Sequence, residues 1–182
     1  NIIQEAIAIG AKTVIVPECG HSYPALRWEG AAMAGKPLPF EVLAVSEFIG
    51  REVQAGRLKL KSAGARKLTY HDACKLGRHG GVLEEPRAAL RALGVDYRES
   101  SPAGEMNWCC GGGAGVFLLN RASPLRQRAF ELKQRQIDAT GAEAVVMSCG
   151  SCRLNFLNGQ AQSGWPVQVE SLVELVGANL AD

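Results

Sequence analysis

The chain has 182 residues, 47% of them hydrophobic, and a formal net charge of +2. This length and composition are typical of a folded domain with a buried core and exclude a disordered chain. The small charge, with no basic run interleaved with aromatic residues, argues against a nucleic-acid partner. No apolar stretch is long enough to span a bilayer, so direct insertion into a membrane is not expected.

Short apolar segments alternate with segments of helical character along the chain. We expect strands at residues 13–16, 41–45, 67–71, 95–98, 144–147 and 167–169. We expect helices at residues 2–9, 25–34, 46–55, 84–93, 116–120, 123–140 and from 171 onward. Strands that alternate with helices predict a mostly parallel α/β sheet, in which functional sites form at the carboxyl ends of the strands.

Two stretches of the chain resemble each other. Residues 10–22 (GAKTVIVPECGHS) match residues 141–152 (GAEAVVMSCGSC), and each is followed by a helix, a strand after a proline, and a last helix. We therefore divide the chain into residues 1–60, the second half of a truncated first repeat, and residues 61–182, a complete repeat. The chain starts without methionine, and we expect it to be a fragment of a longer protein. The missing half predicts an uncovered apolar strand edge or face.

The most informative pattern is the adjacent pair Cys109 and Cys110, with glycines behind it. Two adjacent cysteines make sense as thiolates delivered to one metal centre. The glycines, including Gly111 and Gly112, let the backbone approach the sulfur atoms and offer N–H groups to them. A tight turn into a helix is the alternative interpretation of these glycines.

Three further cysteines extend the pattern: Cys74, Cys149 and Cys152. Their long gaps fit a cluster that is assembled from distant loops of a folded domain. Five thiolates exceed the four that a cubane cluster or a structural zinc ion requires. Secreted disulfide scaffolds are short and loop-rich, so a cytoplasmic metal site is the better interpretation. A four-thiolate zinc site with one spare cysteine is the alternative.

Two histidines and the sixth cysteine are candidate catalytic residues. His71 could supply a proton to a departing thiolate, or it could be a strand-end residue that is fixed by hydrogen bonds. His21 could reach the cleft between the repeats with Glu18 to orient it, or it could be an ordinary loop residue. Cys19 could be an extra ligand, a substrate-facing thiol or a small buried apolar residue.

Several basic residues lie beside the predicted ligands or on the longest helix. Lys75, Arg78 and Arg153 could offset cluster charge or attract an anionic substrate, or they could face solvent. The helix over residues 123–140 carries a charged face that we expect to be exposed to solvent, with docking to a partner as the alternative. The residues of this face are Arg126, Arg128, Lys133 and Arg135.

At these residues the chain resembles the cysteine-rich CCG-domain family of heterodisulfide reductases. Related subunits of glycolate, glycerol-3-phosphate and lactate oxidation systems belong to the same family. The resemblance rests on residues 70–78 (YHDACKLGR), with Ala73 where family members usually have proline, and on residues 107–113 (NWCCGGG). Within the family, residues 16–23 (VPECGHSY) and 26–28 (LRW) resemble the DsrK subunit of the membrane-bound complex of sulfur metabolism.

The resemblance implies parallel-sheet α/β repeats of the CCG type, one complete and one partial. It also implies a noncubane 4Fe-4S cluster whose ligands are Cys74, Cys109, Cys110, Cys149 and Cys152. The implied activity is reduction or oxidation of a disulfide or trisulfide on a DsrC-like sulfur-carrier protein, with a membrane cytochrome subunit as a second partner. The protein would be cytoplasmic and peripheral on the inner face of the membrane through its partner subunits. The alternatives are an electron-relay subunit of the glycolate- or lactate-oxidation type and a zinc-stabilised interaction module.

Overall fold

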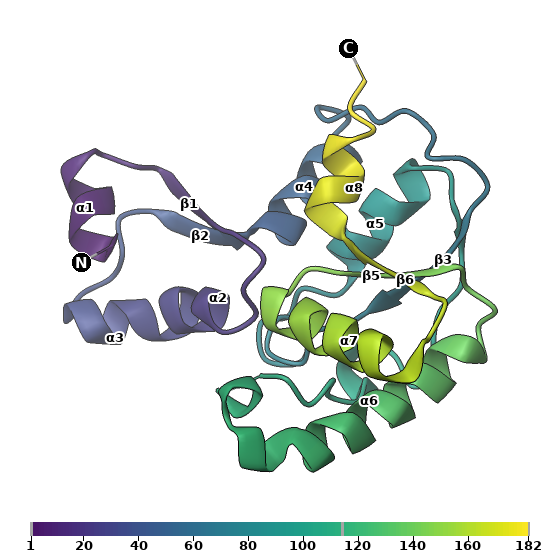
Figure 1. The fold of residues 1–182 in the computed structure, drawn as a ribbon. Helices are drawn as coiled ribbons and strands as arrows, with labels where there is room; N and C mark the ends of the chain where they lie inside the picture. Colours follow the sequence, from purple (N-terminus) through teal and green to yellow (C-terminus); the bar gives the residue numbers. More distant parts are fainter. Residues whose placement is uncertain (1, 114, 182) are drawn as a thin grey trace.

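The computed structural model describes residues 2–113 and 115–181, and these residues form two parallel sheets (Figure 1). The smaller sheet pairs β1 (Thr13–Val16) with β2 (Glu41–Ala44). The larger sheet has the order β4-β3-β5-β6 and is parallel throughout. Its strands are β3 (Lys67–His71), β4 (Asp96–Tyr97), β5 (Ala144–Met147) and β6 (Gln168–Ser171). The predicted parallel α/β class is therefore confirmed.

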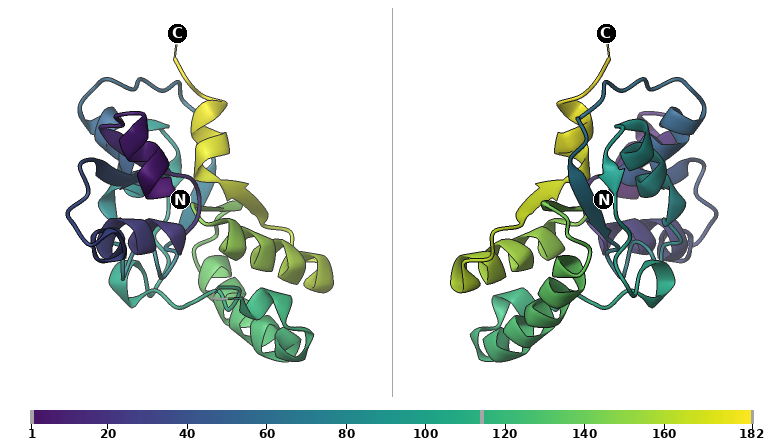
Figure 2. Two further views of the ribbon diagram at one scale, coloured as in Figure 1. Left: turned by 90° about the vertical axis from the view of Figure 1, so that its left-hand side faces the viewer. Right: turned by 90° about the vertical axis from the view of Figure 1, so that its right-hand side faces the viewer.

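Helices cover both faces of the larger sheet (Figure 2). On one face, α4 (Val45–Gln54), α5 (Glu84–Ala92) and α8 (Leu172–Gly177) bury an apolar core that includes Leu68 and Tyr70 of β3. On the other face, α6 (Ser123–Asp138) and α7 (Gly150–Ser163) lie side by side over Val145 and Met147 of β5. Because side chains alternate along a strand, His71 of β3 points to the α6–α7 face. Its ring lies 5.0 Å from that of Phe156 on α7.

The smaller sheet is covered by α1 (Ile2–Ala8) and by one continuous helical segment at residues 22–34. That segment consists of α2 (Ser22–Pro24), a π-helical turn (Ala25–Glu29) and α3 (Gly30–Ala34). It begins three residues earlier than the predicted helix over 25–34. The helix α4, which follows β2, leaves this sheet and packs against α5 of the larger unit. A Cβ on Gly50 of α4 would lie 2.4 Å from Glu85 Cβ, so glycine permits this close contact.

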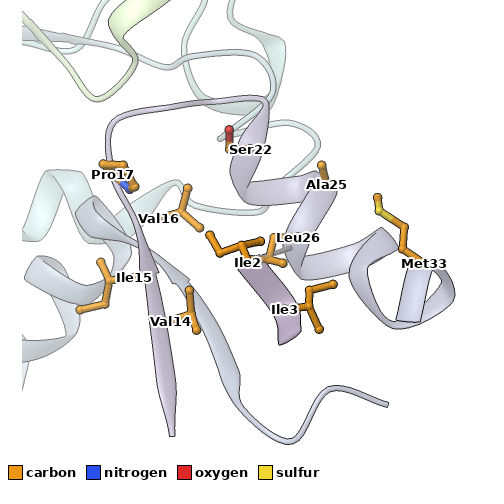
Figure 3. Close-up of a pocket in the computed structure, with 10 residues that line it drawn as sticks. All are labelled: Ile2, Ile3, Val14, Ile15, Val16, Pro17, Ser22, Ala25, Leu26 and Met33. Atoms are coloured by element: carbon orange, nitrogen blue, oxygen red, sulfur yellow. The ribbon is translucent and has the colours of Figure 1, made fainter. Parts of the chain in front are cut away.

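An apolar groove of about 500 Å³ opens beside β1 (Figure 3). Its walls come from α1, from β1 and from the helical segment at 22–34, and they include Ile2, Ile15 and Met33. These three side chains are 64%, 41% and 65% exposed. Within residues 2–113 and 115–181, β1 pairs only with β2, whereas β5 has a neighbour on each side. The groove is therefore an uncovered apolar face of the smaller unit.

The remaining segments are short. The described residues form 3₁₀ turns at Gly104–Met106, Val116–Leu118 and Asn120–Ala122, so two short 3₁₀ turns replace the predicted helix over 116–120. The helix that the repeat predicts after Cys149 is α7. None of the helices in the described part of the chain is long and apolar enough to cross a membrane.

Candidate metal centre

The five cysteines of the predicted ligand set reach one pocket from three parts of the fold. Cys74 lies just after β3, Cys109 and Cys110 lie in the loop before α6, and Cys149 and Cys152 lie at the start of α7. All five line the same pocket, together with Gly20 and His21 of the smaller unit. The free space that these residues enclose is only about 10 Å³.

The sulfur atoms form a continuous row. Cys74 Sγ lies 4.0 Å from Cys109 Sγ. The thiol groups of Cys109 and Cys110, of Cys110 and Cys152, and of Cys152 and Cys149 then interact closely enough to shift one another's pKa values. An all-sulfur donor set of this kind fits an iron–sulfur cluster, and four of its members would also fit zinc.

The hydrogen bonds between these thiols shift their pKa values in opposite directions. Bonds from Cys110 and Cys74 lower the pKa of Cys109, and a bond from Cys152 lowers the pKa of Cys149. Donation to Cys109 raises the pKa of Cys74 and of Cys110, and donation to Cys110 and then Cys149 raises the pKa of Cys152. Because the thiolate is the form that binds a metal, the lowered pKa values of Cys109 and Cys149 favour their binding form.

The glycines behind the cysteine pair hold the loop against the sulfur atoms. The Gly111 N–H donates to Cys109 Sγ at 3.3 Å, and the Gly112 N–H donates to Cys110 Sγ at 3.4 Å. Gly111 has φ of +88°, a conformation that side chains disfavour. A Cβ on Gly112 would lie 2.6 Å from the Cβ of Asn155 on α7.

Gly112→Ala is expected to destabilise the fold by about 1–3 kcal/mol, because the added methyl overlaps Asn155 and forces the loop away from α7. Urea unfolding of the reduced protein measures this loss. The matched control is Gly177→Ala at the end of α8, where a Cβ meets nothing within 4 Å. An equal effect of the two substitutions would contradict the close approach of the loop.

His71 is buried at the edge of this row of sulfurs. Its side chain is 1% exposed, and one of its ring nitrogens lies within 4.8 Å of Cys110 Sγ and Cys152 Sγ. Burial, followed by the positive charge of Lys133, lowers the pKa of His71 to about 3. The ring is therefore neutral near pH 7 and carries one N–H. A histidine that exchanges protons in each turnover works best with a pKa near the operating pH, so this environment favours a hydrogen-bonding role.

Lys133 and Asn107 belong to this site, although no sequence pattern indicated it. Lys133 is 1% exposed, and its Nζ donates to Asn107 Oδ1 at 2.6 Å and to Gln136 Oε1 at 2.8 Å. The expectation that the charged face of this helix lies in solvent is thus wrong for Lys133, and also for Arg126, which is 8% exposed. Lys133 stays buried because it finds side-chain acceptors there, and burial lowers its pKa to about 8.

Asp72, next to His71, forms a buried ion pair that the sequence also did not predict. Arg87 of α5 donates to Asp72 Oδ1 at 2.8 Å and to Asp72 Oδ2 at 2.9 Å, and it also bonds Glu99. Burial disfavours the charge of Arg87, but the bonds to these two carboxylates raise its pKa overall. The Gly104 N–H donates to Asp72 Oδ2 at 2.7 Å. Asp72 therefore ties the end of β3 to α5 and to the loop that leads to the cysteine pair.

The loop at residues 18–21 brings the smaller unit to the edge of the pocket. The Gly150 N–H donates to Glu18 O at 2.8 Å, and the Ser171 hydroxyl donates to Glu18 Oε2 at 2.7 Å. Glu18 thus anchors the loop to the larger unit, and no hydrogen bond between Glu18 and His21 occurs in the described residues. His21 lines the pocket and lies so close to Gly113 that a Cβ there would be 3.0 Å from its ring.

Cys19 does not line the sulfur pocket, although its neighbours Gly20 and His21 do. Its Sγ accepts a hydrogen bond from the Ser22 hydroxyl at 3.1 Å. Ser22 occupies the position that matches Cys152 when residues 10–22 are compared with residues 141–152. Its hydroxyl therefore bonds Cys19 in place of contributing a thiol. Within the described residues, no hydrogen bond joins Cys19 to the row of five sulfurs.

The three basic residues beside the ligands differ in their surroundings. Arg78 donates to the carbonyls of Glu105 and Asn107, both at 2.6 Å, and so holds the loop before the cysteine pair. Arg153 forms an ion pair with Glu174 at 2.6 Å. Lys75 lines the pocket, and its ammonium has no ion pair within residues 2–113 and 115–181.

Comparison with known proteins gives the following matches. Residues 68–157 match the family model described as "Cysteine-rich domain" (CCG). The chain is 38% identical over 163 residues to a "Probable membrane-anchored ferredoxin" of Chromohalobacter salexigens, covering 88% of this chain and 24% of that protein. It is 32% identical over 173 residues to a subunit of the dihydromethanophenazine:CoB–CoM heterodisulfide reductase of Methanosarcina barkeri, covering 94% of this chain and 41% of that protein. It is also 34% identical over 155 residues to "EtfAB:quinone oxidoreductase" of Syntrophomonas wolfei, covering 82% of this chain and 21% of that protein. The chain thus spans less than half the length of each of these relatives.

Proposed function

We propose, from the cysteine-rich domain family that residues 68–157 match, that this chain is the cluster-bearing part of an iron–sulfur oxidoreductase subunit. The observation that carries the proposal is the row of five sulfur atoms, with the backbone N–H groups of Gly111 and Gly112 directed at two of them. Relatives whose names identify a heterodisulfide reductase and a quinone oxidoreductase support this role. The finer proposal is a noncubane 4Fe-4S cluster with Cys74, Cys109, Cys110, Cys149 and Cys152 as ligands.

The proposed reaction is the reductive cleavage of a disulfide or trisulfide on a DsrC-like sulfur-carrier protein, or its reverse. Cleavage of a disulfide consumes two electrons and two protons and yields two thiols. The cluster, when bound, supplies the electrons in one-electron steps. The electrons come from a partner subunit, for which we propose a membrane cytochrome that holds the protein at the inner face of the cytoplasmic membrane.

We assign proton donation and substrate binding to different residues around the pocket. His21, at the pocket wall and partly exposed, is the proposed proton donor to a departing thiolate. Lys75 is the proposed partner of a substrate carboxylate, because Arg78 and Arg153 are already engaged. A carboxy-terminal arm of the carrier protein that bears cysteines would approach between the smaller unit and the Cys109 loop. Cys109 is the exposed member of the sulfur row, so this side of the row is reachable.

The test is a binding assay with a full-length DsrC-like protein and with a tail-truncated form. We expect the truncated form to bind more weakly, salt to weaken binding, and Lys75→Met to reduce the affinity several-fold, as for a rim charge pair of about 1 kcal/mol. The matched control is Lys59→Met, which removes an exposed lysine that does not line the pocket.

Equal affinity for the two forms of the carrier would eliminate entry of its arm. In the same assay, His21→Ala should slow single-turnover reduction more than it weakens binding. No effect on reduction would remove the proposed proton-donor role.

An electron-relay role without substrate chemistry is the second candidate. It is favoured by the small free space at the sulfur row, about 10 Å³, and by the ferredoxin name of one relative. A paramagnetic signal that the disulfide substrate induces would support the first function, and its absence in a cluster-loaded protein would support the relay.

A further inference from the structure

The amide of Asn107 can adopt one orientation only in its surroundings. Its Oδ1 accepts from the ammonium of Lys133 at 2.6 Å, and an ammonium group can only donate. Its Nδ2 donates to the backbone carbonyl of Asp72, and a carbonyl can only accept. Asn107 is 1% exposed, so water does not offer other partners.

The orientation of Asn107 decides which ring nitrogen of His71 carries the proton. Asn107 Nδ2 lies 3.4 Å from His71 Nδ1, and an amide nitrogen is a donor. His71 Nδ1 must then be the unprotonated acceptor, and the neutral ring carries its proton on Nε2. His71 Nε2 is buried and has no hydrogen-bond partner among residues 2–113 and 115–181.

A buried N–H without an acceptor loses its hydrogen bond to water and gains nothing in return, so this group needs a partner. The sulfur atoms of Cys110 and Cys152 lie within 4.8 Å of a ring nitrogen of His71, and they become anionic acceptors when they bind a metal. We propose that Asn107, oriented by Lys133 and the Asp72 carbonyl, is a positioning residue that fixes His71 as the Nε2–H tautomer and directs this N–H at the sulfur atoms of the metal centre. Residues that are not ligands themselves but hydrogen-bond to the ligands in this way tune the charge and the redox potential of a metal site. The acceptor role of the sulfur atoms rests on the proposed function, because it requires a metal bound there. The tautomer of His71 does not.

Nitrogen NMR of the full chain with ¹⁵N-labelled histidine, under reducing conditions, tests the tautomer without any metal. The signals of His71 are assigned by elimination, because His21→Gln and His79→Gln remove the signals of the other two histidines, neither of which is buried. We expect an unprotonated Nδ1 and a protonated Nε2 at pH 7. A proton on Nδ1, or on both nitrogens, would overturn the inference, and this result does not depend on any variant that could fail to fold.

Asn107→Asp tests the cause. The carboxylate offers acceptors only, so it should move the proton of His71 to Nδ1 and cause the loss of the signal of a singly protonated Nε2. The matched control is Asn158→Asp, the same change at an exposed position of α7, which should leave the His71 signals unchanged. Retention of the Nε2–H tautomer in a folded Asn107→Asp protein would contradict the positioning role.

Cadmium serves as the metal probe, because it binds thiolates and is not redox-active. On cadmium binding, the Nε2–H signal of His71 should shift and exchange more slowly with water, and Asn107→Asp should lose this response. Bound cadmium with an unchanged Nε2–H signal would overturn the link to the sulfur atoms. If no metal bound at all, the proposed metal centre would fail, while the tautomer result would still decide the role of Asn107.

Discussion

Replacing Cys109 or Cys110 with serine is expected to abolish or convert the metal centre. Wild-type protein that is reconstituted without oxygen should bind about four irons per chain with a similar amount of acid-labile sulfide. Cys109 bonds both Cys74 and Cys110 and so lies inside the row of sulfurs, and the loss of an inner ligand breaks the row into two parts. Iron and sulfide analysis, with the visible absorption of the cluster, measures the change.

The matched control for this experiment is Cys19→Ser. Cys19 lies outside the sulfur pocket and bonds Ser22, so its loss should leave iron and sulfide content unchanged. Stoichiometric zinc without labile sulfide in the wild type would contradict the cluster and support the zinc alternative. Loss of iron from the Cys19 variant would add Cys19 to the ligand set, and an unchanged iron and sulfide content in the Cys110 variant would contradict its place among the ligands.

Arg87→Met should be among the most destabilising single changes outside the sulfur row. It leaves the carboxylate of Asp72, which is 2% exposed, without its counter-charge. Breaking a buried ion pair by removing one partner typically costs about 3–5 kcal/mol, and we expect a loss of this size. Urea unfolding of the reduced, metal-free protein gives the change in the free energy of unfolding.

Two comparisons make this measurement specific. Arg98→Met removes an exposed ion pair with Asp96 and should cost about 0–1 kcal/mol. Adding Asp72→Asn to Arg87→Met removes the unpaired charge and should recover part of the loss. If Arg87→Met cost no more than Arg98→Met, the buried pair would not be important for the stability of the fold.

Local patterns in the sequence were enough to predict the elements that depend on neighbouring residues. Apolar runs and glycines located the strands around Cys74 and Cys149, and the parallel order followed from the alternation of strands with helices. The spacing of the cysteines marked five candidate ligands, because few other structural roles need adjacent cysteines followed by glycines. The same reasoning failed for residues 116–120, where the described N-cap residues give no side-chain cap and the chain forms two short 3₁₀ turns.

The partners of the polar residues were decided only by the tertiary structure. In the sequence, Lys133 is one more charge on a helix face that should be exposed to solvent, and the acceptor that holds it inside lies 26 residues away, on Asn107. Asp72 and Arg87 are 15 residues apart, and His71 and Asn107 are 36 apart. The sequence alone predicted which cysteines are candidate metal ligands, and it predicted the parallel α/β class of the fold. Burial and hydrogen bonding arise only when distant segments meet, so only the folded chain decided which charges are buried and which groups surround His71.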